Sequence, residues 1–160
     1  MILIGISAII GGVIILLPLI LTITLPDLNR INIKIDKIDY EGLIEKNNTA
    51  VLNLFFNVTN PTNQALTTSK IDYRLFANGE SLGDYTIQYL DIPVNGRPQF
   101  LANRDGVIQH EINVPIVDEK FVTDLKNNNN TLKNIEWKVE GSAIIESGFS
   151  SAIKNFTASW

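Results

Sequence analysis

His110 is the first residue to weigh as a catalytic group, because it is the only histidine of the 160-residue chain. An imidazole in a suitable site acts as a general base or as a metal ligand. Its sequence neighbours Ile108 and Ile112 are apolar and share its side of an alternating pattern. Nucleophile–base catalysis needs a positioned partner, and the sequence around His110 indicates none. We therefore predict a structural histidine at a sheet edge of the core, with hydrogen-bonded ring nitrogens.

Carboxylates are the other candidates for chemistry. Those that stand in pairs or beside expected turns are Asp36, Asp39, Glu111, Glu119, Asp84, Asp91 and Asp105. Paired carboxyl groups can act as acid and base, and oxygen ligands near turns can bind Ca²⁺. The sequence contains no EF-hand loop, no phosphate-binding glycine loop and no Gly-x-Ser-x-Gly motif. Since carboxylates are common on solvated faces, we expect no enzyme activity, no cofactor and no metal site.

Composition removes further classes of function. The chain has no cysteine, which excludes disulfides, thiolate catalysis and cysteine-ligated metals. The net charge is −4 without a basic cluster, which argues against nucleic acid as a partner. All 13 basic and 17 acidic residues lie from Asp27 onward. The charge therefore divides the chain into an uncharged beginning and a polar remainder.

The polar remainder alternates apolar and polar side chains with the period of two that is typical of strands. Ile31, Ile33 and Ile35 share one face, and the phase then slips at Ile38 and Tyr40, as a β-bulge would produce. Further strands are expected over Leu52–Val58, Ile71–Ala77, Ile108–Val114, Ile135–Ile145 and Phe149–Phe156. Strands at this spacing predict a mainly β, antiparallel sandwich.

Turn residues and one short helix separate these strands. The expected turns are at Asn60-Pro61, Asn78-Gly79, Asn95-Gly96, Asp105-Gly106 and Ser147-Gly148. Asp118 can cap a helix whose apolar face contains Phe121, Val122 and Leu125. The asparagine run 127–130 is expected to end that helix.

The uncharged beginning predicts a membrane anchor. Ile2 to Leu25 is a run of twenty-four residues without a charge. As a helix rising ~1.5 Å per residue it reaches about 36 Å, enough to cross a hydrocarbon core of ~30 Å. A cleaved signal peptide fits less well, because no basic residue precedes the run and no Ala-x-Ala site follows it. We predict an anchor over residues 1–26 and a β-sandwich domain over residues 27–160.

Small residues mark one face of the expected anchor. Gly5, Ala8 and Gly12 lie at i, i+3 and i+7, a spacing that lets another helix approach closely. Glycine is also common in membrane helices without any such contact. Both interpretations stay open, and the first makes these three residues a helix-packing face.

Two features point in opposite directions for the side of the membrane. Arg30, Lys34 and Lys37 follow the run and favour a cytoplasmic domain. Four Asn-x-Ser/Thr sequons favour an extracytoplasmic one. Their possible N-glycosylation sites are Asn47, Asn57, Asn129 and Asn155. We expect an extracytoplasmic domain on a single-pass protein of the cell membrane, with Asn57 on an outer strand face.

The order of several motifs resembles a known family. They are Asn57-Val58-Thr59-Asn60-Pro61, Ile71-Asp72-Tyr73-Arg74-Leu75, Asn78-Gly79, Gly83, Ile92-Pro93, Gly96, Val114-Pro115, the helix near Phe121–Leu125 and the stretch Trp137–Gly141. Together, over roughly residues 31–157, they look like the group-2 late-embryogenesis-abundant domain, also called the water-stress and hypersensitive-response domain. The resemblance implies an immunoglobulin-like β-sandwich with one helix, and a binding or protective role without known catalysis. Family members tethered by one amino-terminal helix exist.

Three functions follow as alternatives. The first is a membrane-anchored sandwich with a structural, protein-interaction or stress-protective role. The second is an accessory subunit of an integral membrane enzyme or transport complex, whose helix packs against other subunits. The third is binding of a lipid or a small apolar ligand inside the sandwich. The expected partners are membrane lipid and a protein bound by the helix or by the sandwich surface.

Overall fold

The computed structural model describes residues 25–127, 132, 134–148 and 150–160. Within this part, the strands are β1 (Asn32–Ile44), β2 (Thr49–Asn60), β3 (Leu66–Ala77), β4 (Glu80–Gln88), β5 (Gln99–Phe100), β6 (Arg104–Pro115), β7 (Trp137–Glu146) and β8 (Ser151–Ser159). The helical elements are the 3₁₀ turns η1 (Leu28–Arg30), η2 (Glu45–Asn47) and η3 (Val94–Gly96), and the α-helix α2 (Glu119–Asn127). Strands therefore dominate the domain, as the alternation predicts.

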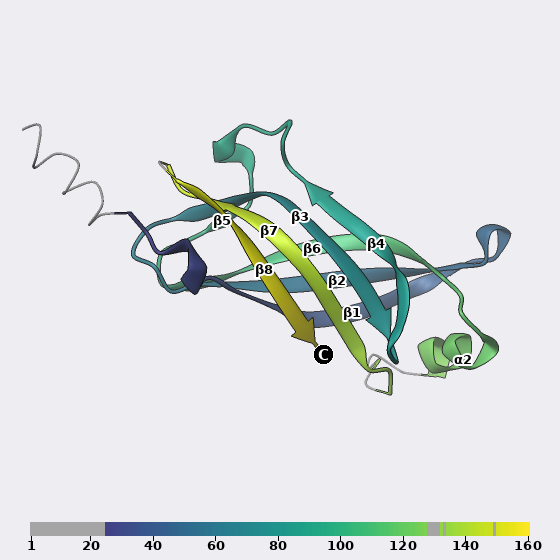
Figure 1. Cartoon of the computed structure of the whole chain (residues 1–160). Helices are drawn as coiled ribbons and strands as arrows, with labels where there is room; N and C mark the ends of the chain where they lie inside the picture. The colour runs from purple at the N-terminus through teal and green to yellow at the C-terminus, as the bar shows by residue number, and fades with distance from the viewer. Residues whose placement is uncertain (1–24, 128–131, 133, 149) are drawn as a thin grey trace, which may run out of the picture.

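The strands form two antiparallel sheets that pack face to face (Figure 1). One sheet has the order β1-β2-β6, and the other has the order β4-β3-β7-β8 with β5 also paired to β3. If the long strands are named A, B, C, C′, E, F and G in chain order, the sheets read A-B-E and C′-C-F-G. This is a strand order of the immunoglobulin class.

Side chains from both inner faces fill the space between the sheets. The expected inward positions, such as Leu54 on β2, Leu75 on β3 and Val139 on β7, are fully buried. The largest fully buried side chains are those of Trp137, Phe56, Phe100, Ile31, Ile33, Ile38, Leu52, Leu54, Leu66, Ile71, Leu75 and Leu125. Two aromatic edge contacts join Phe56 to Tyr73 and Phe156, at ring-centroid distances of 5.1 and 6.4 Å. The interior is therefore a packed core.

Several local predictions are confirmed by the geometry. The pairing of β1 with β2 shifts register between Ile35 and Lys37, which is the expected bulge. Asp118 caps α2, since its Oδ1 accepts a 2.6 Å hydrogen bond from the Phe121 amide. Asn78 and Gly79 join β3 to β4 with φ values of 50° and 82°, as a tight hairpin turn requires.

One local prediction is wrong, and another is confirmed with different bounds. Asp105-Gly106 is not a turn, because both residues lie inside β6, where Gly106 pairs with Val58 of β2. A side chain at Gly106 would meet the Phe100 ring, with a Cβ–Cδ1 distance of 2.8 Å, so this glycine serves close packing. The last strand runs over Ser151–Ser159 instead of 149–156, and it continues until its final residues pair with the start of β7.

Pro26 is the first buried residue of the described chain. Asp27 caps η1 through a 3.1 Å hydrogen bond from the Asn29 amide, and Leu28 joins the core. Trp160 packs against the core at the other terminus, and its backbone exchanges hydrogen bonds with Trp137. Residues 25–160 contain the whole described core, and we expect them to fold alone.

The predicted membrane span and its Gly5, Ala8 and Gly12 face lie outside the described residues. Among the residues that are described, no helix is both long enough and apolar enough to cross a membrane.

Candidate functional site

His110 lies on β6, an edge strand, with its side chain turned to the inner face. Its Nδ1 is 2.8 Å from the Tyr73 hydroxyl oxygen, a hydrogen bond that joins the two sheets. The Tyr73 and His110 rings also meet edge to face, with centroids 5.9 Å apart. Burial lowers the pKa of His110 and raises that of Tyr73 above its ordinary value. The placement at the sheet edge is as predicted, and the interaction serves packing between the sheets.

The acidic candidates do not gather into one site. Asp39 pairs with Lys37 at 2.6 Å on β1, and Asp84 accepts two hydrogen bonds from Arg74 at 2.7 and 3.0 Å. The guanidinium of Arg74 lowers the pKa of Asp84. Within the described ranges, no three His, Asp or Glu side chains are grouped as metal binding requires.

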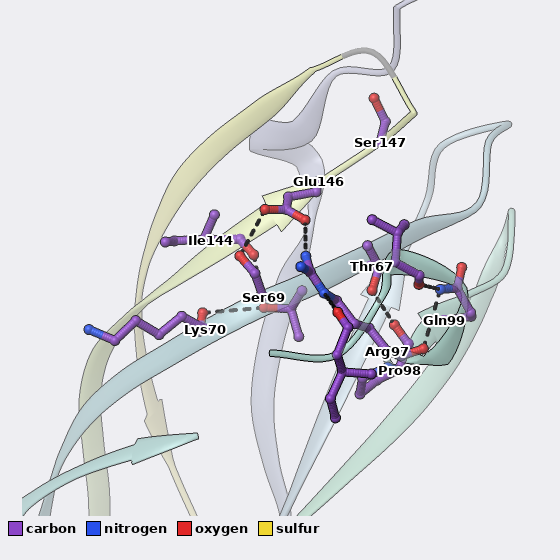
Figure 2. Close-up of polar contacts among 12 residues, drawn as sticks. Thr67, Ser69, Lys70, Arg97, Pro98, Gln99, Ile144, Glu146 and Ser147 are labelled. Carbon is purple, nitrogen blue, oxygen red and sulfur yellow. Dashed lines mark hydrogen bonds and ion pairs between the residues drawn. The ribbon is translucent and has the colours of Figure 1, made fainter. Parts of the chain in front are cut away.

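A polar cluster fixes the connection between β4 and β5 at one end of the sandwich (Figure 2). Arg97 Nη1 and Glu146 Oε2 form an ion pair at 2.6 Å, and their side chains are only 12% and 25% exposed. The other carboxylate oxygen of Glu146 accepts a 2.8 Å hydrogen bond from Ser69 of β3. Arg97 Nε donates to the Ile92 carbonyl at 2.8 Å. One arginine thus ties residues 89–98, called here the β4–β5 loop, to strand β7.

The rest of this loop is also held through its backbone. The Tyr89 amide donates to the Ser69 carbonyl at 2.8 Å, and Thr67 Oγ1 donates to the Pro98 carbonyl at 2.7 Å. Gln99 Nε2 donates to the Val94 carbonyl at 2.9 Å. These hydrogen bonds hold the loop in one conformation against β3 and β5.

Apolar side chains project from that outer surface. Leu90, Ile92 and Val94 of the loop, and Leu101 just after β5, are exposed by 39% to 56%. Leu25, at the start of the described chain, is exposed as well. We call these five residues the apolar rim. Loops usually expose polar residues, so the three exposed apolar residues of the β4–β5 loop make it a candidate surface for contact.

Asn60 fixes the segment after β5 that carries Leu101. Its side chain is fully buried, and its Nδ2 donates to the carbonyls of Phe100 and Leu101 at 2.8 and 3.2 Å. Its Oδ1 accepts from the Thr62 amide at 3.0 Å. Leu25 lies beside this region, in a shallow groove that also contains Thr62 and Asn103.

The rim therefore lies at one end of the molecule. The first described residues, the β7–β8 turn and β5 lie together at this end, and α2 lies at the opposite end (Figure 1). Val94 lies next to the β7–β8 turn, in a groove that it shares with Glu146 and Ser147.

The predicted glycosylation sites differ in accessibility. Asn47 on η2 and Asn155 on β8 are exposed. Asn57 lies on the outer face as expected, but on the central strand of its sheet, where it is half-buried. Asn129 lies outside the described residues. Glycosylation itself stays a prediction.

Comparison with known proteins supports the fold. No protein-family description and no curated protein matches the sequence. A protein of Arabidopsis thaliana with a solution structure is similar over 80% of this chain and 78% of its own, with 11% identity and a TM-score of 0.52. At that identity the similarity supports the expected sandwich fold alone.

Two further solved structures are similar with TM-scores below 0.5. A protein from Archaeoglobus fulgidus shares 11% identity over 81% of this chain and 92% of its own, with a TM-score of 0.46. A candidate late embryogenesis abundant (LEA) protein shares 13% identity over 98% of this chain and 83% of its own, with a TM-score of 0.43.

Replacing His110 with glutamine should flatten the pH dependence of stability. Because burial lowers the folded-state pKa, the unfolded chain binds the imidazole proton first as the pH falls below about 6.5. The wild-type free energy of unfolding should therefore decrease as the pH is lowered, whereas glutamine does not titrate. Urea unfolding of residues 25–160 across about pH 5 to 8 measures the difference. Parallel profiles would show that His110 is not held neutral by the fold.

Replacing Arg97 with methionine should weaken the domain by ~1–3 kcal/mol, since Glu146 loses its cation while partly buried. Arg74→Met is the matched control, because the Arg74–Asp84 pair has similar geometry with side chains 53% and 70% exposed. The Arg74→Met substitution should change the free energy of unfolding little, because exposed ion pairs contribute little. Urea unfolding of residues 25–160 compares the two variants, and equal losses would contradict a special role for Arg97.

Proposed function

We propose that this chain is a membrane-tethered β-sandwich that acts outside the cytoplasm by binding a partner, without catalysis. The uncharged run from Ile2 to Leu25 carries this proposal, because twenty-four such residues suffice to span a bilayer. The run is followed directly by Pro26, which is buried in the described part of the chain.

Contacts of the candidate catalytic residues support a binding role. His110 is engaged by Tyr73, and Asp84 is engaged by Arg74. Each of these interactions holds one element of the sandwich to another. A fold of this class carries function on its loops and outer faces, where the apolar rim offers a contact surface.

Binding of a small apolar ligand inside the sandwich is less well supported. Such a ligand would have to displace Phe56, Leu75 or Trp137, all of which are fully buried between the sheets. Stress protection stays a prediction from the family resemblance, since similarity at 11% identity extends to the fold alone.

A second candidate function is that of an accessory subunit in a membrane complex. The spacing of Gly5, Ala8 and Gly12 favours it, because small residues at i, i+3 and i+7 allow close packing of helices. Native gel electrophoresis after mild solubilisation separates the candidates. A mass near that of the 17.8 kDa chain plus detergent supports the first, and a large stable assembly supports the second.

Carbonate extraction tests the tether. The full-length chain should stay with the membrane at alkaline pH. Carbonate releases proteins that are held by peripheral contacts, but it does not extract an uncharged run that is buried in the bilayer. Residues 25–160 alone should be released, and they serve as the control. Release of the full-length chain would overturn the proposal.

Chemical labelling tests the side of the membrane in the same preparation. Because the chain has no cysteine, a single Ser151→Cys substitution at an exposed position gives a unique thiol. A membrane-impermeant maleimide should label it on intact cells. Labelling only after lysis would place the domain in the cytoplasm.

A further inference from the structure

We propose that the apolar rim inserts into the headgroup region of the bilayer, so that this end of the sandwich rests on the membrane. The inference depends on the proposed tether and adds a second, lateral contact to it. The occupant of the rim is then lipid, and the orientation of the domain on the membrane is fixed.

The first argument is that no linker separates the uncharged run from the described domain. The uncharged run ends at Leu25, and Pro26 is already buried in the domain. Consecutive Cα atoms are only ~3.8 Å apart, so a chain leaving the hydrocarbon at Leu25 brings the domain with it. The headgroup region adds roughly 5–7 Å on each side of the hydrocarbon core. The end that carries Leu25 therefore lies within this region or at its surface.

The second argument is that the rim presents exposed apolar side chains on a fixed loop. Leu90, Ile92 and Val94 are exposed on a loop whose backbone is bonded inward to Arg97 and Gln99. Exposed apolar side chains gain free energy when an apolar phase removes them from water. A fixed loop also loses little conformational entropy when it inserts.

Charge around the rim indicates which lipid it suits. Charged side chains at this end include Asp27, Arg30, Asp91, Arg104 and Asp105, which are exposed, and Lys154, whose Nζ donates to the Asn29 carbonyl at 2.7 Å. Three are basic and three are acidic, without a basic cluster that would select anionic lipid. Insertion is therefore expected to rest on apolar contact and to occur on zwitterionic phosphatidylcholine at any salt concentration.

Site-specific fluorescence tests the inference on the full-length chain in phosphatidylcholine vesicles. A cysteine at Val94, labelled with an environment-sensitive fluorophore, should show blue-shifted emission that nitroxide-labelled lipid quenches and aqueous iodide does not. Val117→Cys is the matched control, because Val117 is an exposed valine just before α2, at the opposite end. Its label should be quenched by iodide and not by the lipid nitroxide.

A third label separates failure of the rim from failure of the tether. Leu16→Cys lies within the uncharged run, and the lipid nitroxide should quench it. If it does and the Val94 label stays accessible to iodide, the rim inference is overturned while the tether stands. If the Leu16 label is also in water, the tether fails and the rim inference fails with it.

Two substitutions test whether apolar contact itself causes insertion. The double substitution Leu90→Ser and Ile92→Ser, at two exposed positions, should expose the Val94 label to water, so that iodide quenches it. Raising the salt concentration should leave the original label unchanged. Two results would contradict insertion through apolar side chains. One is quenching of the Val94 label by the lipid nitroxide that persists in the serine variant, and the other is loss of that quenching at high salt in the original protein. Protection of the Val94 label only after another protein is added would identify a protein as the occupant instead.

Discussion

Each strand of this protein must bury one face against the opposite sheet, and the rest of the structure follows from that requirement. Alternating residues of β2, β3 and β7 meet in the middle, where Phe56, Leu75 and Trp137 are fully buried. A ligand between the sheets would have to displace such side chains, because protein interiors are close-packed. The hydrogen bond between His110 of the edge strand β6 and Tyr73 of the inner strand β3 then joins the two sheets. The outer faces and the ends of the sandwich are then the surfaces that a partner can reach.

The two ends of the sandwich differ in how their surfaces are built. At the end near Leu25, Arg97 and Glu146 draw the polar backbone of the β4–β5 loop inward, so apolar side chains remain outside. At the opposite end, α2 places Phe121 in the core, and Trp160 packs nearby against the strands. Ile44 and Val117 are also exposed near that end, but the end near Leu25 has three exposed apolar residues, Leu90, Ile92 and Val94, on one loop. A membrane directly beside Leu25 would account for that concentration.

Features that depend on near neighbours could be predicted from the sequence, and those that depend on distant pairs could not. The bulge in β1 and the Asp118 cap follow from residues within a few positions of each other. The Asp105-Gly106 turn was a wrong prediction because β2, far away in the sequence, draws these residues into a ladder. Arg97 and Glu146 are 49 positions apart, and no local pattern pairs them. The available signal for the rim was Leu90, Ile92 and Val94 in a stretch otherwise typical of a loop.

Amide hydrogen exchange, compared between the full-length chain in phosphatidylcholine bilayers and residues 25–160 in solution, tests the central claim most directly. If the end near Leu25 rests on lipid, amides of residues 89–101 exchange more slowly in the bilayer, because lipid excludes water from that surface. Amides of residues 116–127, at the opposite end, exchange at the same rate in both samples. Equal exchange of residues 89–101 in the two samples would contradict the account.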